Sequence, residues 1–148
     1  MVILNILTIL CIGLLIGTEF AVSVFIGPVL EQLDNVARPT AIRLFAARLG
    51  TAMPFWYILS LLLLVTQAVL HRHEHGLSLL ISASAIWTAV IVFSVIVLVP
   101  INNRMARLDP DTWTETNRQA HKRWDALHRV RVALLTAAMA CLLLAIHI

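Results

Sequence analysis

The sequence alternates between four long apolar segments and shorter polar ones. The apolar segments cover residues 2–30, 49–70, 77–99 and 132–148. A helix needs about 20 apolar residues to cross the hydrocarbon core of a bilayer, and about 17 is the lower limit. Each segment is close to this length. We therefore predict an all-α protein, a four-transmembrane-helix bundle that forms a single membrane domain over residues 1–148.

The composition supports a membrane protein and excludes several other classes. Hydrophobic residues make up 60% of the chain and charged residues 13%, about half the charged share of a soluble domain. The mean hydropathy of +0.90 excludes a disordered or collagen-like chain. The two cysteines, Cys11 and Cys141, both lie in apolar segments, so we expect no disulfide. The net charge of +3 is explained by membrane topology, and we expect membrane lipid and no nucleic acid as a partner.

The basic residues predict the orientation of the chain. Ten of the eleven lysines and arginines lie in the loops 31–48 and 101–131, and the remaining one is Arg72. The positive-inside rule places these two loops in the cytoplasm and both termini outside, in a bacterial-type inner or plasma membrane. The first basic residue is Arg38. The N-terminal segment therefore lacks the basic region of a signal peptide, and we expect an uncleaved helix.

The two basic loops are predicted to be partly helical. Residues 40–48 are expected to form a short helix, and residues 111–131 an amphipathic cytoplasmic helix. The sequence Asp109-Pro110-Asp111-Thr112 is typical of a helix start, because Asp or Thr caps free N–H groups and Pro fits the first turn. From Trp113 onward we predict one helix that continues into the fourth span. The last helix is thus extended on the cytoplasmic side.

Glu19 is an acid inside the first span, and such a residue is a candidate functional residue. Glu19 follows Met1 by 18 residues, and Arg131 precedes Ile148 by 17. If both chain ends lie at the outer surface, a rise of 1.5 Å per residue places both side chains about 26 Å from that surface, near the inner boundary of the hydrocarbon core. Two interpretations remain open. Glu19 forms a buried ion pair with Arg131 or Arg48 that fixes helix packing, or it lines an inward-facing polar pocket.

One face of the predicted last helix combines aromatic and polar side chains. With 3.6 residues per turn, these side chains fall within about 60° of one another: Trp113, Asn117, Trp124, His128 and Arg131. The opposite face is basic and is typical of contact with anionic lipid headgroups. The aromatic face has two interpretations. In the first interpretation, this face consists of interfacial tryptophans and a snorkelling arginine. In the second, it forms the wall of a pocket with a titratable imidazole.

The remaining histidines do not predict a metal site. His71, His73 and His75 alternate in the short outer turn and have the side chains to bind zinc or copper. A turn this short between two helices rarely supplies complete metal coordination, so we expect a solvated polar turn. The sequence also lacks HExxH, CxxC and glycine-rich phosphate motifs, and no two histidines lie at matching depth on facing spans to hold haem. The cofactor is unknown from the sequence.

Three segments of the chain resemble the DUF1772, or anthrone oxygenase-like, family of small four-helix membrane proteins. The first runs from Gly17 to Val24 and is followed by Pro28 and Leu33, and the second is Val99-Pro100-Ile101-Asn102-Asn103. The third contains Trp113, Arg123-Trp124, His128 and Arg131 before an alanine- and leucine-rich helix. Their order and their spacing relative to the spans match the family along nearly the whole chain.

This resemblance implies a membrane oxidoreductase that acts on a lipophilic aromatic or quinone-like substrate, because some fungal members are linked to the oxidation of anthrones to anthraquinones. Such a reaction needs a base and a donor to the developing oxyanion. The resemblance implies His128 or Glu19 as the base, Asn102 and Arg131 as donors, and Trp124 as a residue that stacks on the substrate ring. We also expect Trp113 and Asn117, on the same predicted helix face, to bind substrate. The alternative is a non-enzymatic small membrane subunit, assembly factor or lipid-binding protein. We also expect a homo-oligomer or a larger membrane complex as a possible assembly.

Overall fold

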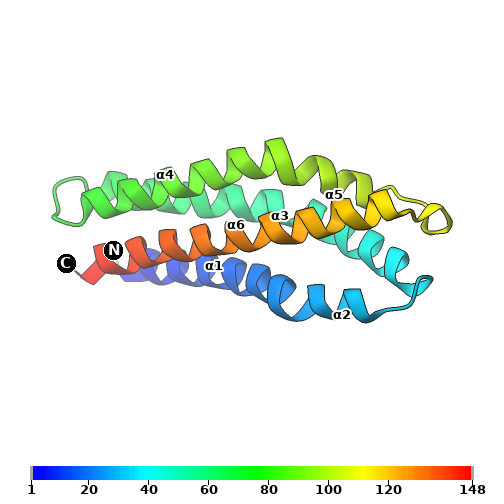
Figure 1. Ribbon diagram of the computed structural model, residues 1–148. Helices are drawn as coiled ribbons and strands as arrows, with labels where there is room; N and C mark the ends of the chain where they lie inside the picture. Colours follow the sequence, from blue (N-terminus) through cyan, green and yellow to red (C-terminus); the bar gives the residue numbers. More distant parts are fainter. Residues whose placement is uncertain (1, 148) are drawn as a thin grey trace.

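The computed structural model describes residues 2–147, and within that range it is a bundle of four long, antiparallel helical segments without strands (Figure 1). The segments are Val2–Gln32, Ala37–Leu70, Leu77–Ala106 and Glu115–His147. The predicted all-α four-helix bundle is therefore confirmed. The predicted domain begins at Met1, and both this domain and the predicted fourth span end at Ile148. These two residues lie outside the described part of the chain.

The first and third segments each contain a wide π-helical turn. The first segment consists of α1 (Val2–Ala21), the π turn η1 (Val22–Ile26) and α2 (Gly27–Gln32). The third consists of α4 (Leu77–Phe93), the π turn η2 (Ser94–Leu98) and α5 (Val99–Ala106). The second and fourth segments are the single helices α3 (Ala37–Leu70) and α6 (Glu115–His147), and the short 3-10 helix η3 (Pro110–Thr112) precedes α6.

Both π turns have a local cause in the sequence. Pro28 follows η1 and Pro100 follows η2, each as an early residue of the next α-helix. A proline inside a helix lacks the N–H for the hydrogen bond to the fourth residue before it, and its ring collides with that carbonyl. A wider turn accommodates both effects. A third proline, Pro54, lies inside α3.

The helices extend well beyond the predicted spans at the end of the bundle that carries the basic loops, here called the basic end. Residues 40–48 continue directly into the second span as part of α3, and residues 101–106 continue the third. The four segments have 30 to 34 residues, which corresponds to at least about 45 Å of helix, against a hydrocarbon core of about 30 Å. The helix length that exceeds the hydrocarbon core lies at the basic end, where most of the charged residues are.

The last helix begins at Glu115, so the prediction of a helix from Trp113 is wrong. Asp109 caps only the short helix η3, where its side chain accepts a 3.1 Å hydrogen bond from the Asp111 N–H. Trp113 then adopts an extended conformation with φ −64° and ψ 123°. The hydroxyl of Thr114 accepts from the Asn117 N–H at 3.4 Å and caps the long helix instead. Trp113 is thus not on the same helix face as His128.

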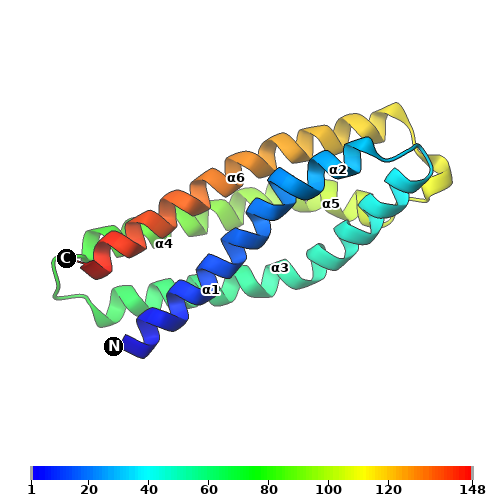
Figure 2. The same ribbon diagram turned by 90° about the horizontal axis from the view of Figure 1, so that it is seen from below.

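Each helical segment packs against two neighbours. The first and the third segment both contact α3 and α6, and Figure 2 shows the antiparallel arrangement from a second direction. The buried core contains Ile12, Trp87 and Leu135, whereas large apolar side chains such as Phe55 and Ile96 are 76% and 68% exposed. An apolar exterior around a core that also holds ionisable groups is the arrangement that lipid, rather than water, requires.

Candidate functional site

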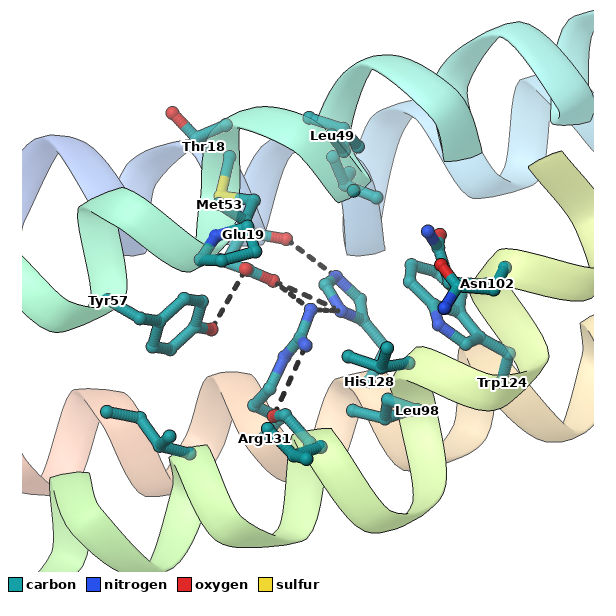
Figure 3. A pocket seen from close by; sticks show the side chains of 18 of the residues that line it. Thr18, Glu19, Leu49, Met53, Tyr57, Leu98, Asn102, Trp124, His128 and Arg131 are labelled. Carbon is teal, nitrogen blue, oxygen red and sulfur yellow. Dashed lines mark hydrogen bonds and ion pairs between the residues drawn. The ribbon is translucent and has the colours of Figure 1, made fainter.

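Glu19 is the centre of a buried network that joins three helices. Its side chain is almost completely buried, with 2% of the residue exposed. Oε1 accepts a 2.9 Å hydrogen bond from the Tyr57 hydroxyl of α3, and Oε2 accepts a 2.7 Å bond from Nη2 of Arg131 on α6 (Figure 3). The predicted ion pair with Arg131 is confirmed. Arg48, the other predicted partner, has an exposed side chain.

Both ring nitrogens of His128 form hydrogen bonds, and the chemistry of the two partners determines which nitrogen carries the proton. Nδ1 lies 2.8 Å from Nη2 of Arg131, and Nε2 lies 3.1 Å from the backbone carbonyl oxygen of Glu19. The guanidinium of Arg131 has only donors, so Nδ1 is the acceptor and Nε2–H donates to the carbonyl. His128 is therefore a neutral imidazole in this arrangement. Nδ1 is also 3.1 Å from Oε2 of Glu19, so an imidazolium formed there has an anion beside it.

Arg131 has donor capacity that the network does not use. Nη1 donates to the Ser94 hydroxyl at 3.4 Å, and the guanidinium carbon lies 5.6 Å from the centre of the Tyr57 ring. Its Nε is buried and has no hydrogen-bond partner in the part of the chain that the structure describes. A buried N–H without a partner is rare and costs free energy. The same atom has almost no exposed surface, so a bound acceptor would reach it only after a shift of the Arg131 side chain.

The network borders a cavity of about 180 Å³. Glu19, His128 and Arg131 line it, and most of the other lining residues are apolar: Val22, Leu49, Met53, Ile58, Ile91, Val95, Leu98 and Val99. A dry protein cavity of about 150 Å³ binds benzene. This cavity therefore has space for an aromatic ring next to an acid, an imidazole and a guanidinium.

The cavity reaches the lipid-facing surface of the bundle. Ile58 of α3, Val95 of η2 and Val99 of α5 line it and are 54%, 59% and 37% exposed. These three residues lie on the outside of the bundle, between α3 and the third segment. The opening is thus an apolar one, suited to a molecule dissolved in the membrane rather than in water.

Asn102 forms the wall of the cavity toward the basic end. Its Nδ2 donates a 2.9 Å hydrogen bond to the Ala46 carbonyl oxygen of α3. The absence of a side chain at Gly50 permits this contact, since a Cβ there would lie 2.6 Å from the same nitrogen. An amide nitrogen carries two hydrogens. One of them therefore remains for an acceptor in the cavity.

Trp124 lines the cavity between two histidines of the same helix. Its ring stacks on His128 with centroids 4.7 Å apart and planes inclined by 10°, and it stacks on His121 at 6.2 Å and 7°. The spacing of three and four residues along α6 produces this column of parallel rings. The stack fixes the plane of the His128 imidazole and presents an aromatic face near the cavity.

The two other predicted substrate-binding residues lie away from the cavity. Asn117 accepts a 2.9 Å hydrogen bond from Nη2 of Arg104 and thereby ties α6 to α5. Trp113 packs against a separate apolar cluster at the basic end that includes Leu30, Ile42 and Met105. The helix start at Glu115 removes Trp113 from this helix face, whereas Asn117 lies on α6 but seven residues before Trp124, about 10 Å nearer the basic end. Both residues have structural contacts instead.

Tyr57, Ser94 and Gly50 were not predicted as site residues. Tyr57 is the single tyrosine of the chain, and it lies within an apolar span, where its hydroxyl needs a partner. The position of this tyrosine in an apolar span therefore indicates a buried hydrogen bond, from which Tyr57 could have been predicted as a site residue. Ser94 and Gly50 carried no such signal, because a small residue in a transmembrane helix is common and usually serves close packing.

A family model described as anthrone oxygenase matches residues 41–141. This segment includes Tyr57, Asn102, Trp124, His128 and Arg131, whereas Glu19 precedes it. No curated protein and no solved structure gives a significant match. The match covers more than half of the 148 residues, and with its four membrane-spanning helices the chain belongs to the anthrone oxygenase family as an integral membrane protein.

Proposed function

We propose that the protein is an oxidoreductase that uses O₂ to oxidise a lipophilic aromatic ketone of the anthrone type. One observation carries this proposal: Glu19, His128 and Arg131 form one wall of an apolar cavity that reaches the lipid-facing surface. The family description names the same class of reaction for proteins that this chain resembles. A buried ion pair that served packing alone would not require an adjacent cavity.

In the proposed first step, His128 acts as the base. Its Nδ1 takes a proton from the activated CH₂ group opposite the ketone, the C–H bond breaks, and its electron pair moves into the ring system to give an enolate oxygen. Nδ1 lies 3.1 Å from Oε2 of Glu19, so the carboxylate stabilises the imidazolium. Glu19 is then a positioning and charge-balancing group. A positioned base typically accelerates such a step by about 10² to 10⁴.

The enolate oxygen is stabilised by donors that have no partner in the resting network or lose their partner when His128 is protonated. The Nε–H of Arg131 has no partner among residues 2–147, and one N–H of Asn102 remains after its bond to Ala46. Protonation of Nδ1 also releases the Nη2–H of Arg131 that the imidazole accepted before. Donors that face a developing oxyanion at a site without water stabilise it far more than water does.

The second step consumes O₂. The carbanion carbon of the enolate bonds to O₂ and yields a hydroperoxide after it recovers a proton, which His128 can return. Loss of water from the hydroperoxide forms the second carbonyl group. For anthrone the balance is one substrate and one O₂ to one anthraquinone and one water, so the substrate is oxidised and O₂ supplies the oxidant. The proposed roles require no further residue.

The lipid-facing opening and the basic end suggest how the protein is placed in the membrane. A flat, water-insoluble substrate is concentrated in the bilayer, and it meets the cavity between α3 and the third segment. We propose the orientation that the positive-inside rule gives, with the basic end in the cytoplasm of a bacterial-type inner membrane and both termini outside.

The test is turnover by purified protein in lipid nanodiscs, with anthrone as the probe. Both O₂ consumption and anthraquinone absorbance are measured above the background without protein. We expect turnover by the wild type, and a decrease of at least about 100-fold for His128→Ala and for His128→Gln, which keeps a hydrogen-bonding side chain. His75→Ala, in the exposed outer turn, is the matched control and should keep full turnover.

Two outcomes would overturn the proposal. One is a wild-type protein without turnover above background, which would favour a non-enzymatic role. The other is full turnover by both His128 variants. Equal monodispersity and equal thermal unfolding temperatures of the variants separate loss of the base from loss of the fold.

A further inference from the structure

A second group of ionisable side chains lies outside the network around Glu19. It consists of Glu31 on α2 and of His121 and Asp125 on α6, and one ligand atom from each residue lies within 4.8 Å of the others. His121 and Asp125 are four residues apart, so one helix face presents both. Two segments of the chain that are distant in sequence thus bring an imidazole and two carboxylates together.

The imidazole of His121 is buried and lacks a partner. The residue is 7% exposed, and its Nε2 has no hydrogen-bond partner among residues 2–147. The nearest acceptor of the cluster, Oδ2 of Asp125, is 3.7 Å away, which is beyond hydrogen-bond distance. A buried ring nitrogen without a partner costs free energy. A ligand that approaches Nε2 would remove this cost.

The two carboxylates also lack a close counter-charge. Within the described chain no lysine or arginine nitrogen forms an ion pair of 4.0 Å or less with Glu31 or Asp125. A small cavity of about 30 Å³ is lined by His121 and Asp125, and about 10–15 Å³ suffices for one water molecule. Glu31 does not line this cavity, but its carboxylate lies within 4.8 Å of the ligand atoms of His121 and Asp125, so the cluster offers two carboxylates, a free imidazole nitrogen and adjoining space for a water ligand.

We propose that Glu31, His121 and Asp125 bind a divalent first-row transition metal, such as Mn²⁺, Fe²⁺, Co²⁺ or Zn²⁺. An imidazole with carboxylates suits these ions, whereas Mg²⁺ and Ca²⁺ prefer oxygen ligands alone. Metal–ligand bonds of about 2.1 Å place two ligand atoms of a tetrahedral site about 3.4 Å apart. The ligand atoms now lie within 4.8 Å of one another, so metal binding requires side-chain rotations that bring them closer together. The site is independent of the proposed oxidation.

Metal binding at this cluster would also order the wall of the cavity. His121 stacks on Trp124, and Trp124 stacks on His128. A metal bound to Nε2 fixes the plane of the first ring in this column, and α2 becomes tied to α6. Metal occupancy should therefore change the environment of the Trp124 indole, even when no substrate is present.

The experiment is a titration of the purified full-length chain with Co²⁺ after treatment with a chelator. Co²⁺ absorption in the visible range and quenching of tryptophan fluorescence are both recorded. We expect one Co²⁺ per chain for the wild type, and at least tenfold weaker binding for His121→Ala and for Glu31→Gln. The Glu31 variant alters a half-buried residue near the end of α2 and guards against a failure of the His121 variant to fold.

The outer turn provides the matched control. His73→Ala removes an exposed histidine from the other set of clustered histidines and should leave Co²⁺ binding unchanged. The proposal is overturned if the wild type binds no Co²⁺, if either cluster variant binds it as tightly as the wild type, or if His73→Ala abolishes binding.

Discussion

Arg131 donates a 2.7 Å hydrogen bond to Glu19 across 112 residues of sequence and thereby joins the last helix to the first. Both side chains are nearly completely buried, at 10% and 3% exposure. Loss of one partner from such a pair leaves an uncompensated buried charge and typically costs about 3–5 kcal/mol, whereas replacement of both by apolar groups is often far less costly.

This relationship gives a double-mutant prediction. Glu19→Leu and Arg131→Met should each lower the free energy of unfolding by about 3–5 kcal/mol, and the double variant should be more stable than either single one. Thermal unfolding in detergent measures the three variants against the wild type. The exposed pair of Glu115 and Arg118, at 2.7 Å, is the control, and Glu115→Gln should leave the unfolding temperature unchanged. Strictly additive losses at Glu19 and Arg131 would contradict the prediction.

Two glycines are required by close approach rather than by backbone conformation. A Cβ at Gly76 would lie 2.5 Å from the Ala145 carbonyl oxygen of α6, and one at Gly50 would lie 2.6 Å from Nδ2 of Asn102. Gly76→Ala should therefore destabilise the protein by about 1–3 kcal/mol, because backbone must shift. Gly50→Ala should mainly displace the Asn102 amide and reduce turnover. Gly13→Ala is the control, since nothing lies within 4 Å of its Cβ position, and it should be neutral or stabilising.

The sequence was sufficient to predict the bundle and part of the site. Long apolar segments have one solution in lipid, because every backbone hydrogen bond must be made within the helix. The shared depth of Glu19 and Arg131 followed from counting residues along straight helices, and the observed ion pair confirms it. Helix rise is constant enough for such a count, even though η1 and η2 locally widen two of the segments.

Other features depend on packing and were not predictable from one sequence. The start of α6 was predicted at Trp113, because Asp109 and Pro110 have the expected residue types for a helix cap. They cap η3 instead, and Thr114 starts the long helix. Local capping preferences of neighbouring residues compete, and the packing of Trp113 into the cluster at the basic end is a tertiary contact that a single sequence does not reveal. The role of Gly50 depends likewise on a side chain of another helix.

Asp34 stabilises the connection between α2 and α3 through its charge. Its Oδ1 accepts hydrogen bonds from the backbone N–H groups of Ala37 at 2.7 Å and Val36 at 2.9 Å. These bonds hold the pKa of the Asp34 carboxyl below its ordinary value of 3.8. A lowered pKa in the folded state means that the stabilisation is present above pH 4 and is lost as the pH falls through the folded pKa.

The corresponding prediction concerns the difference between the wild type and Asp34→Ala. The wild type should resist proteolysis of residues 33–36 better than the variant at neutral pH, and this difference should narrow as the pH falls below about 4. Limited digestion with an acid-tolerant protease at several pH values measures it. Asp34→Asn keeps an acceptor without a titrating group, so its cleavage rate should lack this pH-dependent component. A constant difference between wild type and Asp34→Ala would refute the assignment.

The lipid-facing opening of the cavity leads to the last prediction. Val95 of η2 lines the cavity and is 59% exposed, whereas its neighbour Ile96 is 68% exposed and does not line it. Val95→Trp should place an indole across the opening and slow the entry of a membrane-dissolved substrate. Ile96→Trp adds the same side chain to lipid-facing surface beside it. We expect turnover of anthrone in nanodiscs to fall at least tenfold for Val95→Trp and to stay within twofold of the wild type for Ile96→Trp. Equal turnover by the two variants would mean that substrate enters by another route, such as the basic end beside Asn102.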